Sequence, residues 1–137
     1  MTAPAIPDAQ PLINAVEAAV TSHGFLIGDG EKPEDVTDRP YIVAWWDAGR
    51  ITDRTLRSRD GFRVSAIFHS VGQSPEAVRI AVKALRTAIL GLNGAQVGGW
   101  KVQTPSHHPA IPLARDDDKN PPIWTQADEW HFRLSPA

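Results

Sequence analysis

Apolar and polar residues alternate along residues 62–69 with the period of two that a β-strand requires. One set of alternate positions is apolar: Phe62, Val64, Ala66 and Phe68. The intervening positions are more polar: Arg63, Ser65, Ile67 and His69. The pattern predicts a strand with one buried face, and we expect the phenylalanine face to lie in the core.

The period changes after residue 72 to that of an amphipathic helix. Ser74 suits the N-cap, Pro75 the first helical position, and Gly91 the end of the helix. Its apolar stripe consists of Val78, Ala81, Val82, Leu85, Ala88 and Ile89. A second flank at the same spacing is basic: Arg79, Lys83 and Arg86. We interpret this flank either as a solvated helix face or as part of a contact between subunits.

An N-terminal helix is predicted over residues 8–24. Its apolar side chains recur at helical spacing: Leu12, Ile13, Val16, Ala19 and Val20. Pro11 falls in the first turn and Gly24 just past the end, which are typical start and stop signals.

Three further segments have strand character. "PYIVAWWDAG", residues 40–49, is an apolar run that predicts a central strand covered on both faces. "WKVQT", residues 100–104, predicts a short strand, and "IWTQADEWHFRL", residues 123–134, alternates so that Trp130, Phe132 and Leu134 share a face. Between the last two, residues 105–122 hold five prolines and show no periodicity, so we expect a long loop there.

These elements predict an α+β fold, in which two helices pack on one face of a mainly antiparallel sheet of about four strands. The 137 residues suit a single domain, and no internal repeat is present.

Composition excludes several kinds of chemistry. The chain has no cysteine, so disulfides, thiolate metal sites and cysteine nucleophiles are absent. A formal net charge of -2 gives no global attraction to nucleic acid. No apolar run approaches the roughly 18 residues of a membrane span, and "MTAPAIPDAQ" is unlike a signal peptide, so we expect a protein that is not exported by such a signal.

Two neighbouring segments carry opposite charge. Residues 28–40 form an acidic loop that includes Asp35 and Asp38, and residues 50–63 are rich in arginine. On opposite flanks of a subunit, these loops would make it complementary to its own copy in a head-to-tail contact. The alternatives are two independently solvated loops, or contact of the arginine segment with nucleic acid phosphates.

Candidate sites for chemistry are few. The turn at residues 71–75 leads from a strand into a helix N-terminus, which is a geometry that can bind anions, but it lacks the motif of a phosphate or dinucleotide loop. His107 and His108 precede three aspartates in one segment without the spacing of known metal sites. We therefore predict no catalytic, cofactor-binding or metal-binding residue. A small enzyme or ligand-binding domain, with a site at residues 71–75 near His69, is the alternative interpretation.

Several stretches occur in a particular order: "RPYIVAWWDAG", a strand ending in "VG", the helix start "SPE", and "GGWKVQTPSHHPAIPLARDDDKNPPIWTQADEWHFRL". Together with the N-terminal helix they cover residues 8–134, and in order and texture they resemble the tail terminator proteins of long-tailed bacteriophages. The resemblance implies an α+β subunit that assembles as a hexameric ring on the head-proximal end of the tail tube. There it ends tube polymerisation and forms the interface to the head.

The same resemblance implies the partners: further copies of the chain, the tail tube protein, and a head-completion or connector protein. Phage DNA would pass through the ring without sequence-specific binding, and assembly would take place in the host cytoplasm. The resemblance implies no active site. We expect loops 49–60 and 105–122 to make axial or lumenal contacts. The candidate interaction residues are Arg50, Arg54, Arg57, Arg59, Asp35, Asp38, Arg79, Lys83, Arg86, Asp116, Asp117 and Asp118.

Overall fold

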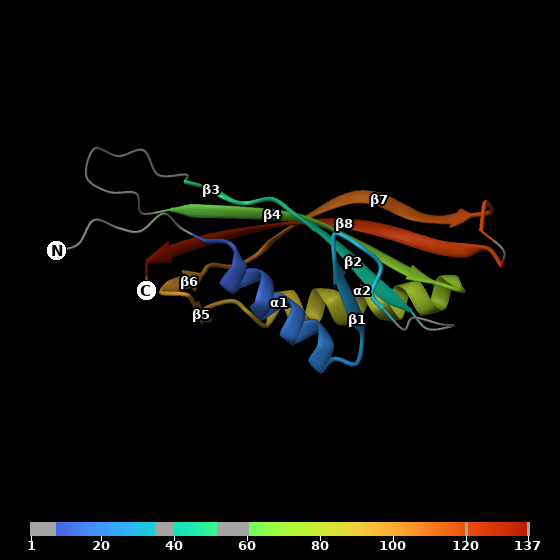
Figure 1. Ribbon diagram of the computed structural model, residues 1–137, viewed down its shortest axis with the longest axis horizontal. Helices are drawn as coiled ribbons and strands as arrows, with labels where there is room; N and C mark the ends of the chain where they lie inside the picture. Colours follow the sequence, from blue (N-terminus) through green and yellow to red (C-terminus); the bar gives the residue numbers. More distant parts are fainter. Residues whose placement is uncertain (1–7, 35–39, 52–60, 120, 137) are drawn as a thin grey trace.

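Two helices pack against one face of a long, twisted sheet in the computed structural model (Figure 1). The structure describes residues 8–34, 40–51, 61–119 and 121–136. The helices are α1 (Gln10–Ser22) and α2 (Pro75–Leu90), and both lie below the sheet in Figure 1. The strands are β1 (Leu26–Asp29), β2 (Tyr41–Trp46), β3 (Arg50–Ile51), β4 (Phe62–Gly72), β5 (Gln96–Val97), β6 (Trp100–Val102), β7 (Ser106–Asp116) and β8 (Ile123–Pro136).

The sheet is built around a central pair of long antiparallel strands, β4 and β8. Its order is β1-β2-β4-β8-β6-β5, with β3 added beside β4 and β7 beside β8. The register of the central pair runs from Phe62 opposite Leu134 to Gly72 opposite Trp124. Strand β1 runs parallel to β2, while the other described pairs are antiparallel.

The predicted α+β class is confirmed, but the prediction of about four strands is wrong. Within the described residues the sheet has eight strands and is mixed. Strand β1 overlaps the predicted acidic loop at residues 28 and 29, because two glycines and an aspartate follow its short apolar start. Strands β3 and β5 are two residues long, which is too short for any periodicity to reveal.

The predicted loop at residues 105–122 is also wrong in large part, because β7 occupies Ser106–Asp116. In the described part of the chain β7 pairs with β8 alone, so it is an edge strand that leaves one row of its N–H groups unpaired. Pro109 and Pro112 are compatible with such a position. Two register shifts occur around Ile111, where the ladder adjusts to the proline-rich sequence. Strands β7 and β8 thus form a long hairpin.

The core lies between the helices and the sheet, as the periodicities predicted. Buried side chains come from the expected faces of β4 and β8 and from the apolar stripes of both helices: Phe62, Val64, Ala66, Phe68, Trp130, Phe132, Leu134, Leu12, Val16, Val20, Val78, Leu85 and Ile89. Ser74 caps α2 by accepting the Ala77 N–H at 3.1 Å. Trp46 packs against the rings of Phe68 and Phe132, with centroids 5.4 and 5.5 Å away.

Strand β2 departs from its predicted environment. Ile42 and Ala44 are buried on the helix side, but Trp45 on the other side is 53% exposed. The strand is interior to the sheet, as expected, yet only one of its faces is covered. Because an apolar run gives the same pattern whether or not its second face is covered, the sequence could not distinguish these cases.

Candidate assembly surface

The sheet face opposite the helices, which we call the helix-free face, is formed by the odd-numbered residues of β2, β4 and β8. Residues paired directly across antiparallel strands point to the same face. Trp45 lies opposite Ile67, and Ile67 lies opposite Glu129. The next row consists of Val43, His69 and Ala127. This places His69 on the less apolar face of its strand, as predicted.

Large apolar side chains lie in the middle of the helix-free face. Trp45 is 53% exposed and Ile67 is 36% exposed, and they are direct cross-strand neighbours. Ile111 on the adjacent edge strand β7 is 51% exposed. A shallow groove of about 240 Å³ runs beside the pair and is bordered by Glu129. Exposed aromatic residues of this kind are enriched at protein contacts.

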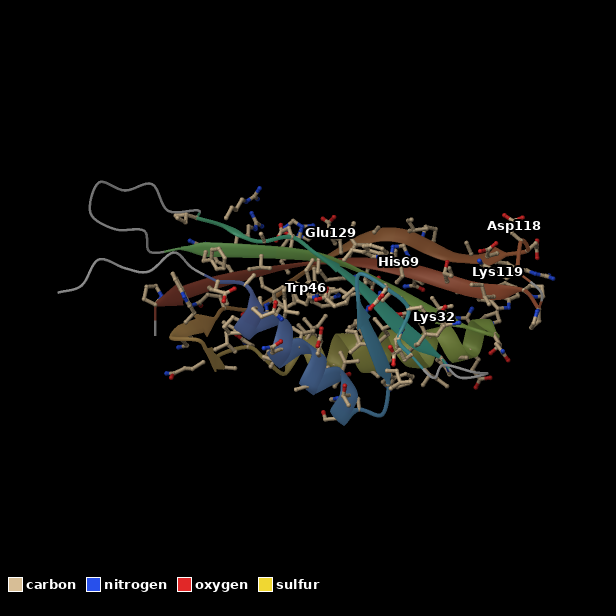
Figure 2. All side chains as sticks on the ribbon, viewed as in Figure 1. Lys32, Trp46, His69, Asp118, Lys119 and Glu129 are labelled. Carbon is tan, nitrogen blue, oxygen red and sulfur yellow. The ribbon has the colours of Figure 1, made fainter. Side chains whose placement is uncertain are left out.

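Polar groups border this apolar centre. Glu129 lies on the side of the sheet away from the helices (Figure 2) and contacts His131, whose Nε2 atom is 2.7 Å from its carboxylate. The His131 ring also stacks on His108 of β7, with centroids 4.2 Å apart. Ser106 Oγ lies 3.1 Å from His108 Nε2. The surface therefore combines an apolar centre with a hydrogen-bonded polar margin, which is the usual composition of a protein interface.

Three arginines lie in one row at one end of the helix-free face. Arg50 of β3 is directly opposite Arg63 of β4, and Arg63 is directly opposite Arg133 of β8. We call these three residues the arginine row. The nearby Asp47 carboxylate accepts the backbone N–H groups of Gly49 and Ser65, both at 3.0 Å. In the part of the chain that the structure describes, no ion pair is found for any arginine of the row.

The helix side of the sheet holds a buried charge. Asp128 is only 2% exposed, and Arg86 of α2 binds it with two hydrogen bonds, of 3.0 Å from Nε and 3.2 Å from an Nη atom. His107 Nε2 lies 3.3 Å from the same carboxylate, without the alignment of a hydrogen bond. Arg86, predicted as an interaction residue, is therefore engaged within its own chain and ties α2 to β8.

These contacts set the protonation of Asp128. Burial raises the pKa of its carboxyl, but the hydrogen bonds and charge of Arg86, together with the nearby His107, outweigh burial and hold the pKa below its ordinary value of 3.8. Asp128 therefore stabilises the fold fully above about pH 4, and this contribution is lost as the pH falls through the folded-state pKa.

We expect Asp128→Asn to be less stable than wild type at pH 7, with a difference that shrinks below about pH 3.8. Urea unfolding across this range measures it, and a difference independent of pH would contradict the assignment.

The other predicted basic residues of α2 are exposed at its surface. Arg79 and Lys83 line a groove of about 260 Å³ together with Arg86 and Leu90. The three basic side chains thus lie on a common flank of α2, as their spacing predicted. Among the described residues, no ion pair involves Arg79 or Lys83.

The predicted aspartates Asp116, Asp117 and Asp118 lie at the turn of the β7–β8 hairpin. Arg115 forms an ion pair with Asp117 and places its guanidinium over the Trp124 ring, 5.5 Å from the centroid. Asp116 accepts the backbone N–H of Asp118 at 3.0 Å. The carboxylates thus project at the end of the molecule, where Figure 2 labels Asp118 and Lys119.

The turn at residues 71–75 joins β4 to α2 closely. Gly72 is buried, and a Cβ atom there would lie 3.1 Å from the Ala77 side chain and 3.3 Å from Val78. The Ser74 hydroxyl occupies one of the N–H donors at the helix start. Packing and capping thus account for the glycine and serine; a ligand site at this turn stays a prediction.

Some predicted residues cannot be placed. Arg54, Arg57, Arg59, Asp35 and Asp38 lie outside the described residues, while Arg50 is exposed on β3. A hollow of about 590 Å³ lies between the start of α1 and the β2–β3 connection, and it supports no assignment. Within residues 8–34, 40–51, 61–119 and 121–136, no three histidine or carboxylate side chains converge as a metal site.

None of the helices described is long and apolar enough to span a bilayer.

Comparison with known proteins adds no assignment: no protein-family model matches the chain, and neither does any curated protein.

Five residues to which the structure gives a part are absent from the candidates predicted from the sequence: Trp45, Ile67, Arg63, Arg133 and Asp128. Asp128 shares its alternate positions with Trp130 and Phe132, so its place in the buried set was a readable signal of a buried carboxylate that needs a partner. Trp45 and Arg133 depend on which face lacks a helix and on the register between distant strands, for which the sequence holds no local signal.

Proposed function

We propose that this chain is a self-assembling structural subunit, which acts through contacts between protein surfaces. The observation that carries this proposal is the exposed apolar pair Trp45 and Ile67 in the middle of the helix-free face. Both helices pack on the opposite face, so nothing in a single copy covers this pair in the described structure. Contiguous exposed apolar surface on a small domain is typical of a site for another protein.

Within this class, the proposed protein is a tail terminator of a long-tailed bacteriophage. The order and texture of the sequence support it, and the α+β class of the structure is the class that the resemblance implies. In this role the chain forms a hexameric ring on the head-proximal end of the tail tube, ends tube growth, and offers the surface for a head-completion or connector protein. Phage DNA passes through the ring without sequence-specific contacts.

A terminator must bind the tube on one side and refuse a further tube subunit on the other. Specificity of this kind requires two ring faces with different chemistry, because the second face has to exclude the subunit that the first resembles. The exposed basic flank of α2, on the helix side, offers one such chemistry.

Electron microscopy of the purified chain in negative stain tests this function. We expect rings of one diameter with a central channel, and, after mixing with tail tubes, rings at one end of each tube. Particles that stay single copies at the highest soluble concentration and do not bind tube ends would contradict the proposal.

A further inference from the structure

The arginine row lacks a counter-charge in the described structure. Like charges placed directly opposite each other in neighbouring strands destabilise a sheet, and here three cations occupy one row. Among the described residues, Asp47 is a carboxylate near this row, and its Oδ1 atom accepts two backbone N–H groups. An anion from outside the subunit would relieve this repulsion.

The opposite end of the same strands is acidic. We define the acidic tip as the carboxylates of Asp116, Asp117 and Asp118 at the β7–β8 turn, where Arg115 neutralises Asp117 and Lys119 adds a single positive charge. The exposed Glu76 in the first turn of α2 adds a further negative charge near this end, because β4 ends at Gly72, opposite Trp124. Asp116 is paired with Ile123, ten residues of extended strand from Arg133, or roughly 33 Å.

We infer that the acidic tip of one copy docks on the arginine row of the next. This inference rests on the proposed self-assembly and specifies its polarity. Charge complementarity favours a second copy as the occupant, since each chain carries both halves of the contact at opposite ends (Figures 1 and 2). A contact between two different patches of the same chain is head-to-tail, and such contacts form a ring when the rotation between successive copies closes. The row also lies on the helix-free face, four residues along β4 from Ile67.

Charge reversal tests the docking. One variant carries Asp116→Arg and Asp118→Arg, which reverses the tip, and the other carries Arg63→Glu and Arg133→Glu, which reverses the row. Each alone brings like charges together, so we expect self-association to weaken about 100-fold or more in sedimentation velocity. Mixing the two variants should restore rings with an even number of subunits, and a chain with all four changes should assemble alone.

Cross-linking gives an independent readout that does not depend on affinity. The chain has no cysteine, so Asp118→Cys and Arg133→Cys introduce the only thiols. The two positions are too far apart within one copy for a short thiol cross-linker, so the double variant should form a ladder of trimers and larger species. Either single variant can form at most a dimer. Thr21→Cys with Arg133→Cys is the matched control, because Thr21 is exposed on α1, and it should give no ladder.

The outcomes separate this inference from the proposed function. The docking would be overturned if both charge-reversed variants formed rings like those of the wild type, or if the double-cysteine variant gave no ladder. Either result would leave the proposal of ring formation intact. Failure of the wild type to associate would overturn the proposed function itself. If the row instead binds nucleic acid, the row-reversed variant would lose binding to duplex DNA in a gel shift, and mixing would restore nothing; that result also overturns the docking.

Discussion

Replacing Arg86 with alanine should lower the free energy of unfolding at pH 7 by about 2 kcal/mol, because it leaves the Asp128 carboxylate buried without its main partner. Loss of one partner of a fully buried ion pair costs roughly 3–5 kcal/mol. The side chain of Arg86 is 41% exposed, so water can replace part of its effect and the expected loss is smaller.

The matched control for this variant is Arg79→Ala, two turns earlier on the same helix. Arg79 is exposed and has no ion pair among the described residues, so its removal should change stability by less than about 0.5 kcal/mol. Arg86→Lys keeps the charge but loses the two-pronged geometry, and should fall between the two. Urea unfolding of the three variants measures the effect, and equal stability of Arg86→Ala and Arg79→Ala would contradict this account.

Interrupting the apolar pair on the helix-free face should abolish self-association while preserving the fold. In the variant that combines Trp45→Thr with Ile67→Lys, threonine suits a strand and lysine faces Glu129 across β4 and β8, so the sheet retains favourable cross-strand pairs. Each removed side chain at the centre of an interface typically contributes about 2 kcal/mol, so the combined change should weaken association roughly 1000-fold.

Ile80 and Leu90 provide the control, because both are large, apolar and exposed on α2. Lysine at both positions removes a similar apolar surface from the helix layer, and we expect association to be unchanged. Sedimentation velocity compares the two variants, and circular dichroism verifies that both are folded. If the helix variant lost association and the sheet variant retained it, the interface would lie on α2 and the account would be wrong.

Local signals in the sequence predicted the parts of the fold in which burial alternates clearly. Phe62 to Phe68, the helix that begins after Ser74, and Trp130 to Leu134 each combine a regular period with definite ends, and the apolar face of each is buried as expected. Strand β7 could not be found in this way, because Pro109 and Pro112 are tolerated there only by its edge position, and that position depends on pairing with a distant strand.

The candidate surface was less predictable than the core. Trp45 and Ile67 become neighbours only through the register of β2 on β4, and the arginine row requires two further registers, between β3 and β4 and between β4 and β8. Arg86 shows the opposite difficulty. Its spacing placed it correctly on a basic flank, but its engagement by Asp128 depends on how α2 crosses β8.

An electron cryomicroscopy reconstruction of the assembled wild-type chain tests the central claim most directly. We predict that a neighbouring copy covers Trp45 and Ile67 and that its hairpin turn reaches the arginine row. A seam formed by the outer surface of α2 around Ile80 and Leu90, with Trp45 still facing solvent, would contradict the account.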